Sequence, residues 1–314
     1  MTPSLTWLSR LCWQVVMVCA AGSRLGVGIG ADAAEPIVLA GPAMGTTYRV
    51  TLAAPIDGLS RGEIHRDLEA VLERIDRAAS TWRDDSDVSR FNAAGAGVWV
   101  SVSADLAAIL AIAQEVHTET HGVFDPTVGP LISLWQDGAQ QPEGEKSEAV
   151  QAALEHVGLQ YVERREPPHG TRSLRKLKPQ ITLDLGGIGP GYAVDCLGER
   201  LCELGSEDHL VTLGGEARAW GMQAPGEPWQ VVVPSTDRGQ PPQVVSVAPG
   251  EAVAFSTPRV GRSPIDPRTG LPATAPLKPV MVRSTTCSRA DALAVAAAIN
   301  AAADLAEADL SAQR

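Results

Sequence analysis

The part of the chain best suited to chemistry is a glycine-rich stretch between an expected β-strand and an expected helix. It reads Thr182-Leu-Asp-Leu-Gly-Gly-Ile-Gly-Pro-Gly-Tyr-Ala-Val-Asp195. Because glycine has no Cβ, a ligand can approach this backbone closely, and the N–H groups that open a helix favour an anion. Pro190 suits the first helical turn, where its missing N–H would have had no partner. The pattern predicts a phosphate or nucleotide site; a plain strand-to-helix turn that needs glycine is the alternative.

The class of nucleotide is narrowed by the glycine spacing and by two acids. Glycines at 186, 187, 189 and 191 do not fit G-x-G-x-x-G, which disfavours a Rossmann-type dehydrogenase. Asp184 and Asp195 flank the turn, and carboxylates beside an anion repel it unless a cation intervenes. We therefore expect a hard cation such as Mg²⁺ to accompany the phosphates.

Composition and charge exclude some classes of partner. The chain has 314 residues, of which 44% are hydrophobic, enough to bury a sizeable core. Its formal net charge is −11, and no run of Lys and Arg with interleaved aromatic residues is present. Nucleic acid is therefore not an expected partner, because neutralisation of phosphates dominates that affinity.

The N-terminus has the pattern of an export signal. Arg10 precedes a mostly apolar run over residues 11–22, and Ala31-Asp32-Ala33 provides an A-x-A cleavage site. The run is shorter than the ~20 residues that a membrane-spanning helix needs. We expect a signal peptide over residues 1–33, one domain over residues 34–314, and a periplasmic or cell-envelope location.

Neither cysteine nor histidine spacing indicates a metal site. Cys196 and Cys202 are six residues apart on an expected helix and Cys287 stands alone, so we interpret them as buried small hydrophobes. His117 and His121 are four apart without an accompanying H-E-x-x-H, and we interpret them as solvated helix residues.

Hydrophobic periodicity and capping signals predict an α+β fold with largely antiparallel sheets. Ser60 and Glu63 form a capping box that opens a helix, and Ser103 caps a second helix that runs to about Thr120. Further helices are expected to end near Trp135, to span 148–157, to end near Leu204 and to begin at Arg289. Strands are expected over 47–52, 98–102, 159–163, 209–213, 229–234, 244–248, 252–256 and 278–285, with loops over 137–147 and 164–180.

Five separated motifs together resemble those of the FAD:protein FMN transferase family, also called the ApbE family. They are Ala43-Met-Gly-Thr46; Ser80-Thr-Trp82 with Asp85-Ser86; Gly122-Val-Phe-Asp-Pro-Thr-Val-Gly-Pro-Leu131; the glycine turn; and Ile265-Asp-Pro-Arg-Thr-Gly270 with Ala290-Asp-Ala-Leu293. The resemblance covers residues 37 to 297 approximately. It implies an ApbE-like, T-fold-like arrangement of antiparallel sheets with flanking helices.

The resemblance also implies an activity. Members of this family are exported, Mg²⁺-dependent enzymes that bind FAD as substrate, split its pyrophosphate and attach FMN to a Thr or Ser hydroxyl of an acceptor flavoprotein. The implied acceptor belongs to an electron-transport complex, which would bring the enzyme near a membrane. Phosphoryl transfer of this kind needs charge neutralisation and in-line positioning more than covalent catalysis.

The matched motifs assign binding residues but no catalytic residue. The positions that would contact FAD are Met44, Trp82 (where the family usually has tyrosine), Val123, Phe124, Asp125 and Asp184. The carbonyl of Gly187 and the carboxylate of Asp291 would bind the metal. Asp125 has an Asp-Pro turn as its alternative role, and Asp291 has that of an acid complementing a helix dipole.

Three positions depart from the family pattern. Pro190 replaces a lysine, Ser263 replaces a histidine, and Val295 replaces a threonine that serves as a metal ligand. Arg259 or Arg262 is a candidate substitute for the missing cation. The departures leave a second hypothesis open: a flavin-binding protein on the same fold whose catalysis is weakened or lost.

Overall fold

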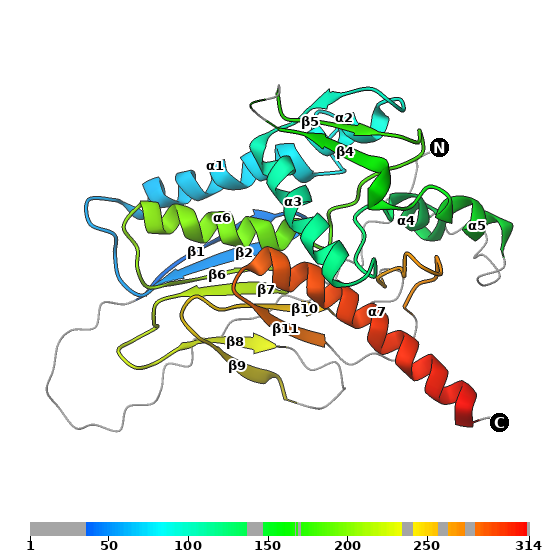
Figure 1. Cartoon of the computed structure of the whole chain (residues 1–314). Coiled ribbons are helices and arrows are strands. Elements are labelled where there is room, and N and C mark those ends of the chain that lie inside the picture. The colour runs from blue at the N-terminus through cyan, green and yellow to red at the C-terminus, as the bar shows by residue number, and fades with distance from the viewer. Residues whose placement is uncertain are drawn as a thin grey trace, which may run out of the picture.

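The computed structural model describes residues 36–136, 147–166, 168, 171–233, 241–256, 263–273 and 280–312, with side chains of the last helix described to residue 303. A six-stranded antiparallel sheet is its largest element (Figure 1). In spatial order its strands are β1 (Ile37–Ala43), β2 (Thr46–Leu52), β6 (His209–Leu213), β7 (Glu216–Trp220), β10 (Ala252–Ser256) and β11 (Val280–Ser284). The expected fold class, α+β with largely antiparallel sheets, is confirmed.

Two smaller sheets accompany it. The first has the order β3 (Val100–Ser101), β5 (Ser173–Lys176), β4 (Val162–Arg165), and β4 follows the short 3₁₀ helix η1 (Leu159–Tyr161). The second is the ribbon of β8 (Trp229–Val233) and β9 (Gln243–Val247). The helices are α1 (Arg61–Ala79), α2 (Asp87–Ala93), α3 (Ala104–Glu119), α4 (Gly129–Gln136), α5 (Glu148–Leu154), α6 (Gly189–Glu203) and α7 (Cys287–Ala312).

The large sheet is covered on both faces, as the alternation of its side chains requires. On β6, Val211 packs with the residues of α1, α6 and α7, whereas its neighbour Leu210 packs with Trp229 and Val231 of the β8–β9 ribbon. Figure 1 accordingly shows α1 and α6 on one side of the sheet and the ribbon on the other. The sheet therefore fixes α6 and α7 side by side on one face.

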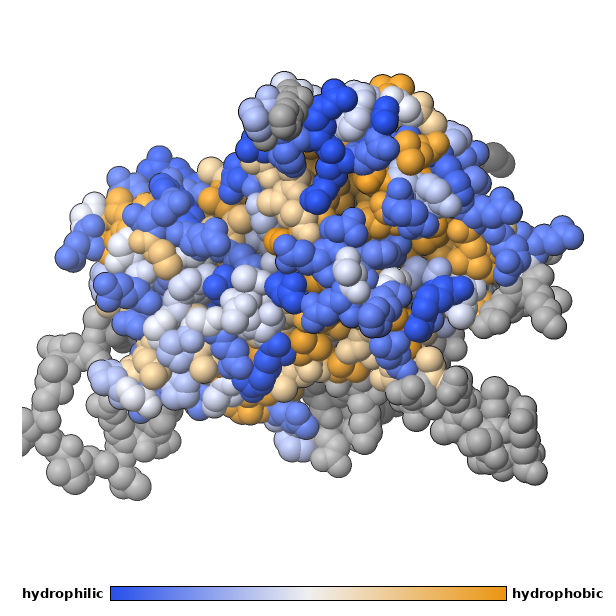
Figure 2. All heavy atoms as spheres, viewed as in Figure 1, coloured by the Kyte–Doolittle hydropathy of each residue, from blue (hydrophilic) through white to orange (hydrophobic). Residues whose placement is uncertain are grey.

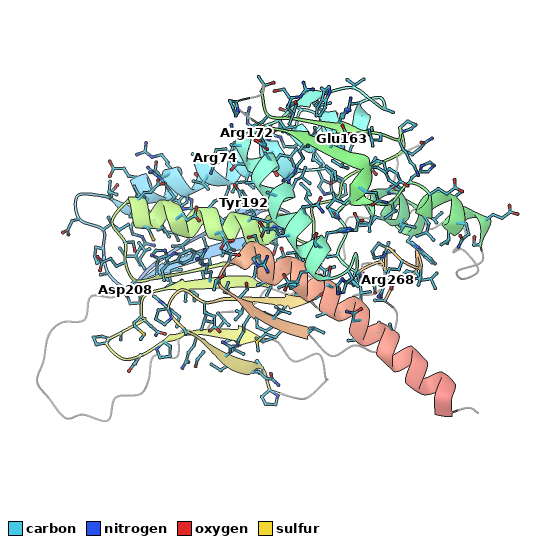
Figure 3. The ribbon with its side chains drawn as sticks, viewed as in Figure 1. Arg74, Glu163, Arg172, Tyr192, Asp208 and Arg268 are labelled. Atoms are coloured by element: carbon cyan, nitrogen blue, oxygen red, sulfur yellow. The ribbon has the colours of Figure 1, made fainter. Side chains whose placement is uncertain are left out.

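A third core lies between α3, α2, α7 and the small sheet, and one polar network links it to the large one. The Tyr192 hydroxyl of α6 donates to Asp105 Oδ1 of α3 at 3.0 Å, and Arg74 of α1 pairs with the same carboxylate. Burial is the main cause that raises the pKa of Tyr192. Figure 3 shows Arg74 and Tyr192 reaching toward the same region from their two helices. The network fixes α6, which carries the glycine turn, relative to α1.

Capping residues set several helix starts as expected. Ser60 Oγ accepts from Glu63 N at 3.3 Å and Glu63 Oε2 accepts from Ser60 N at 2.9 Å, which confirms the capping box. Ser103 Oγ accepts from Leu106 N at 3.3 Å at the start of α3. The last helix begins at Cys287, two residues before the expected Arg289.

Other local predictions are wrong. β1, α2 and β7 were not expected from the sequence, and residues 173–176, expected within a loop, form the central strand of the small sheet. The strand expected before the glycine turn is only an isolated bridge of Thr182 with Val128, because the Leu183 and Asp184 N–H groups donate instead to Asn92 Oδ1 and the Pro126 carbonyl. The loop expected over 137–147 lies almost wholly outside the described residues.

The cysteine and histidine interpretations need two corrections. Cys196 and Cys287 are free and buried as expected, whereas Cys202 is free but exposed. His117 is not a solvated residue: its Nδ1 lies 2.9 Å from the Phe124 carbonyl oxygen and 3.5 Å from Asp125 Oδ2. Among the residues placed by the structure, no helix is long and apolar enough to cross a bilayer. Hydrophilic side chains cover much of the face in Figure 2, with apolar ones between them.

Candidate functional site

The N-termini of α6 and α7 meet, and only a glycine permits the contact. A Cβ added at Gly191 would collide with the Cys287 carbonyl. This close approach brings Gly191 N within 3.0 Å of Asp291 Oδ2, to which it donates a hydrogen bond. The predicted metal-binding carboxylate is therefore attached directly to the end of the predicted phosphate turn.

Asp195 does not face the glycine turn, contrary to the expectation that it flanks an anion. Its carboxylate accepts from Cys287 N at 2.8 Å, from Ser288 N and Ser288 Oγ at 2.9 Å each, and from Arg218 Nη1 at 2.7 Å. The N–H groups that open a helix have no intrahelical acceptor, so a carboxylate from a neighbouring helix satisfies them here. Asp195 thus joins α6 to α7 and to β7.

Asp291 lies in an environment that opposes its negative charge. The residue is 6% exposed. Burial raises its pKa to about 7, the nearby Asp195 charge contributes, and the hydrogen bond from Gly191 acts in the opposite direction. A cation beside this carboxylate would stabilise its ionised form.

Gly187 lies against the same helix face one turn further along. A Cβ added at Gly187 would be 2.8 Å from Val295 Cγ2 and 3.7 Å from Phe124 Cε2. Val295 follows Asp291 by four residues, so both side chains lie on one face of α7. The structure therefore brings Gly187, Asp291 and Phe124 close to Val295, the residue that replaces a threonine of the family pattern.

A hard cation fits this junction only with water completing its shell. No group of three or more His, Cys, Asp or Glu side chains that could hold a metal ion occurs in the described ranges. One buried carboxylate and a neighbouring backbone carbonyl remain as donors, and Mg²⁺ commonly keeps several waters. The Asp291 carboxylate is a hard oxygen donor, which suits Mg²⁺ better than a softer metal.

The matched segment beside the junction is buried and internally bonded. Val123 and Phe124 are 4% and 5% exposed. Asp125 Oδ1 accepts from Thr127 N at 2.7 Å and Thr127 Oγ1 at 2.6 Å, and its Oδ2 accepts from Leu159 N at 3.2 Å. The Asp125 carboxylate thus holds the Asp-Pro turn, and a direct contact with FAD stays a prediction.

Asp184 is partly exposed at the entrance to the glycine turn. Its Oδ1 accepts from Gly186 N at 2.9 Å, and burial raises its pKa. The residue before it is held by Asn92, whose Nδ2 donates to the Leu183 carbonyl at 2.9 Å while its Oδ1 accepts from Leu183 N at 2.8 Å. Asp184 is therefore presented by a segment that an amide side chain fixes.

A buried lysine completes this support. Lys176 is 1% exposed, and its Nζ donates to the carbonyls of Asn92 at 2.7 Å and Ile181 at 3.0 Å. Burial lowers the pKa of Lys176. Neither Asn92 nor Lys176 was predicted from the sequence, because no local signal distinguishes either from a surface residue.

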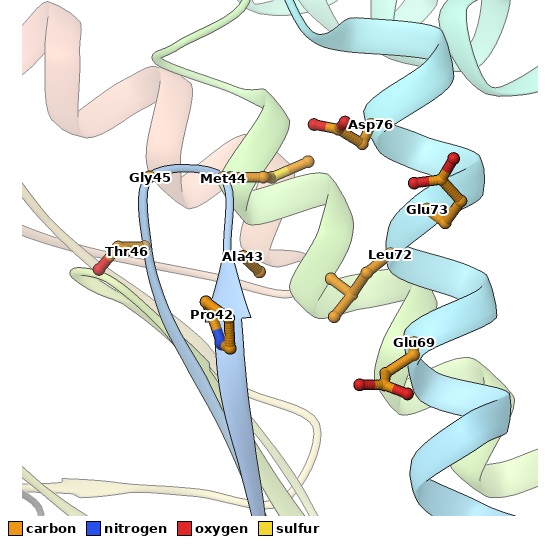
Figure 4. A pocket seen from close by; sticks show the side chains of 9 residues that line it. All are labelled: Pro42, Ala43, Met44, Gly45, Thr46, Glu69, Leu72, Glu73 and Asp76. Atoms are coloured by element: carbon orange, nitrogen blue, oxygen red, sulfur yellow. The ribbon is translucent and has the colours of Figure 1, made fainter.

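Met44 lies in the two-residue turn between β1 and β2. Met44 has φ 47° and Gly45 has φ 74°, the paired positive values of a tight hairpin turn. The turn borders a cavity of about 700 Å³ whose other wall is α1. Figure 4 shows the Met44 side chain extending from the turn toward α1, with Glu69, Glu73 and Asp76 on the facing helix.

Trp82 stands apart from these buried residues. It lies in the connection between α1 and α2 and is 90% exposed. Its neighbour Arg83 contacts Glu73 and Asp76, two residues that line the cavity. The connection between α1 and α2 is thereby tied to the cavity wall.

The other departures from the family pattern lie at different places. Pro190 occupies the first turn of α6, as expected. Ser263 precedes a loop in which Ile265 pairs with Pro272, and this loop packs on α4 through Trp135 Nε1, which donates to the Gly270 carbonyl at 2.8 Å. Arg259 and Arg262 lie outside the described residues.

The arrangement is shared with proteins of known identity. A family model described as the ApbE family matches residues 44–312. Two curated relatives, each called FAD:protein FMN transferase, are similar to the chain. The one from Klebsiella pneumoniae is 33% identical over 273 residues, covering 82% of this chain and 77% of the relative. The one from Haemophilus influenzae is 31% identical over 272 residues, covering 82% and 78%.

Solved structures agree with the sequence comparisons. The flavin transferase ApbE from Vibrio cholerae superposes with a TM-score of 0.73 at 29% identity, covering 84% of this chain and 87% of that one. The apo form of the flavinyl transferase ApbE from Pseudomonas stutzeri has a TM-score of 0.73 at 30% identity, covering 84% of each chain. The chain belongs to the ApbE family.

Proposed function

We propose that the chain is an FAD:protein FMN transferase that moves FMN from FAD to a Thr or Ser hydroxyl of an acceptor flavoprotein. The observation that carries the proposal is the α6–α7 junction, where Gly187 and Asp291 adjoin the opening of a helix. The names of the relatives support the same reaction. Phosphates would reach this place through Mg²⁺, because the Gly189 and Gly191 N–H groups already donate to the Leu185 carbonyl and to Asp291 Oδ2, and Pro190 has no N–H.

The chain's own residues would divide the work of binding. Met44, Trp82 and Phe124 offer apolar or aromatic surface for flat rings, and Asp184 offers an acceptor for polar ring or sugar groups. The exposed Gly186, which has no Cβ, lets phosphate oxygens approach the backbone of the glycine turn. Asp291 and the Gly187 carbonyl would hold Mg²⁺, which when bound neutralises phosphate oxygens during transfer. Burial raises the pKa of Asp291 to about 7, and a bound cation would favour its ionised form over the protonated one.

The cellular setting is part of the proposal. The Arg10-led apolar run and the A-x-A site support export to the periplasm or cell envelope, with residues 1–33 removed as a signal peptide. An acceptor flavoprotein of an electron-transport complex would then be met close to the membrane. The net charge of −11 keeps nucleic acid an unfavourable partner.

A second candidate, a flavin-binding protein with weak or no transfer, is favoured by one contact. The Val295 methyl group faces Gly187 where the family has a threonine oxygen, so the junction offers one fewer metal ligand. Pro190 likewise places no cation beside the phosphates. Each loss removes charge stabilisation of the kind that contributes about 10²-fold in rate.

Incubating the purified protein with FAD, Mg²⁺ and an acceptor flavoprotein separates the two candidates. A covalent flavin on the acceptor that disappears with Asp291→Asn establishes transfer. Bound FAD without covalent product, converted to transfer by Pro190→Lys with Val295→Thr, establishes the second candidate. A protein that binds no FAD contradicts both.

A further inference from the structure

We propose that Arg83 is a positioning residue for FAD: it ties the α1–α2 connection that carries Trp82, called the rim below, to Glu73 and Asp76 in the wall of the cavity between the β1–β2 turn and α1, and it offsets the negative charge of that wall. The inference deepens the proposed function and rests on FAD occupying this cavity. Arg83 itself is not assigned a contact with the flavin.

The Arg83 guanidinium bridges three carboxylates. Its Nε and Nη2 donate to the two oxygens of Asp85 at 3.0 and 3.2 Å. Its Nη1 lies 3.1 and 3.2 Å from the two oxygens of Glu73 and 3.3 Å from Asp76 Oδ2. A planar guanidinium presents its donors in a fixed fork, so contacts in several directions fix its orientation as well as its place.

Trp82 has no packing of its own to hold it. The indole is 90% exposed, and its backbone N–H donates to Ser80 Oγ at 3.3 Å. The connection is closed at its base, since Ser86 Oγ donates to the Ser80 carbonyl at 2.6 Å. Between these ends, Arg83 is the residue that ties the connection to the body of α1. An exposed ring can serve as a stacking platform only if its backbone is held, and Arg83 supplies that restraint.

The same contacts change the charge of the cavity. Glu69, Glu73 and Asp76 line one wall, and FAD brings an anionic pyrophosphate. Hydrogen bonding from Arg77, with further contributions from Arg83, lowers the pKa of Glu73, which therefore stays ionised near neutral pH. Without Arg83, two of the wall's carboxylates would face an incoming anion with less compensation, and repulsion between like charges would oppose binding.

The test compares FAD binding and turnover in Arg83→Gln with a matched control, Arg77→Gln. Arg77 also pairs with Glu73, at 2.7 Å, but it is more exposed than Arg83, lies on α1, and forms no hydrogen bond or ion pair with the described residues of the connection that carries Trp82. We expect Arg83→Gln to weaken FAD binding roughly tenfold, within the range of one lost stacking interaction, and to raise KM for FAD with little change in kcat. Arg77→Gln also removes a charge beside Glu73, so it should weaken FAD binding only slightly, and high salt should abolish that loss.

A double-mutant cycle with Trp82→Ala shows whether Arg83 acts through the indole. If it does, adding Arg83→Gln to Trp82→Ala weakens binding by less than it does alone, and the remaining loss disappears at high salt. Arg83→Lys, which keeps the charge but not the fork, should recover the salt-dependent part alone. Melting temperatures of all variants identify any that fail to fold.

The inference is overturned by unchanged FAD affinity in Arg83→Gln, by the same loss in Arg77→Gln, or by fully additive losses in the cycle. Unchanged affinity in Trp82→Ala would overturn it too, because Arg83 could then not act through that ring. In each case covalent flavin on the acceptor would show that the proposed transfer itself stands. Absence of FAD binding by the unmodified protein would instead remove the proposed function and this inference together.

Discussion

The α6–α7 junction and the cavity rim hold their candidate residues by different means. At the junction, Asp195 and Asp291 are buried and are bonded by backbone N–H groups of the opposing helix. At the rim, Trp82 is almost fully exposed and is held indirectly through the ion pairs of Arg83. Backbone donors cannot rotate away, whereas surface ion pairs exchange readily with water and salt. The junction should therefore keep its geometry at any salt concentration, whereas the restraint that Arg83 places on the rim should weaken as salt rises.

The junction and the rim should also differ in whether their residues affect the stability of the fold or the binding of a ligand. Residues of the junction support the packing of three elements, so substituting them should lower the free energy of unfolding. Residues of the rim lie at the surface, so substituting them should change ligand affinity and leave the free energy of unfolding nearly unchanged. Substitutions in the two regions should therefore differ in their effect, and the largest change in free energy is expected at the junction.

The largest effect is expected from Asp195→Asn. The carboxylate is buried with Arg218, whose guanidinium would keep its charge but lose this ion pair, and removal of one member of a buried pair costs about 3–5 kcal/mol. Urea unfolding monitored by circular dichroism measures the loss. Asp67→Asn is the control, because Asp67 pairs with Arg200 at a half-exposed position and should change stability far less. Equal losses in the two variants would mean that the junction is not the rigid region.

Acid should lower the free energy of unfolding through His209. Burial lowers the pKa of this imidazole from 6.5 to about 4, where it stacks on Trp220 with ring centroids 4.8 Å apart. Because the folded state binds the proton less readily than the unfolded state, the contribution is complete above pH 6.5 and is lost as the pH falls toward 4. The loss between pH 7 and pH 4 should reach roughly 3 kcal/mol.

The His209 contribution is isolated by comparing pH dependences. His209→Gln removes the titrating group while every carboxylate titrates as before, so the free energy of unfolding of the variant should fall less steeply between pH 7 and pH 4. Parallel curves for the two proteins would show that His209 is protonated without penalty in the fold.

At the rim, Trp82→Ala should leave stability unchanged and weaken FAD binding by about 1–3 kcal/mol, the range for stacking a base on an aromatic ring. The ring's 90% exposure means that truncation removes almost no packing. Flavin fluorescence measures the affinity, and thermal unfolding without FAD measures the stability. Trp82→Tyr, which restores the ring that the family usually has, should bind like the unmodified protein. A lower melting temperature in Trp82→Ala would show that the rim shares the junction's structural role.

What the sequence predicted correctly was encoded locally. The Ser60–Glu63 capping box, the Gly122 stop after α3 and the Pro190 helix start each depend on residues a few positions apart. The resemblance paired Gly187 with Asp291, which no local signal connects, and their binding of a metal stays a prediction. The misses depend on distant contacts: Asn92 mimics a strand partner for Leu183 from 91 residues away. The basic run that contains β5 reads as solvated, since nothing nearby shows that Lys176 would find carbonyl partners inside the core.

The smallest effect is expected from Val295→Thr. This substitution tests whether metal binding at the α6–α7 junction is limited by a missing oxygen ligand or by the bulk of Val295. The Val295 methyl group faces Gly187, so a threonine hydroxyl at the same place could bind Mg²⁺ directly or through water. One added polar contact is worth about 1 kcal/mol, which corresponds to a Mg²⁺ midpoint lowered by roughly fivefold. Thermal unfolding at increasing Mg²⁺ measures the midpoint even in a protein that does not turn over. Val295→Ala creates the same room without the oxygen and should leave the midpoint where it is. If alanine and threonine shift it equally, the bulk of Val295 limits metal binding, and the junction is crowded instead of short of a ligand.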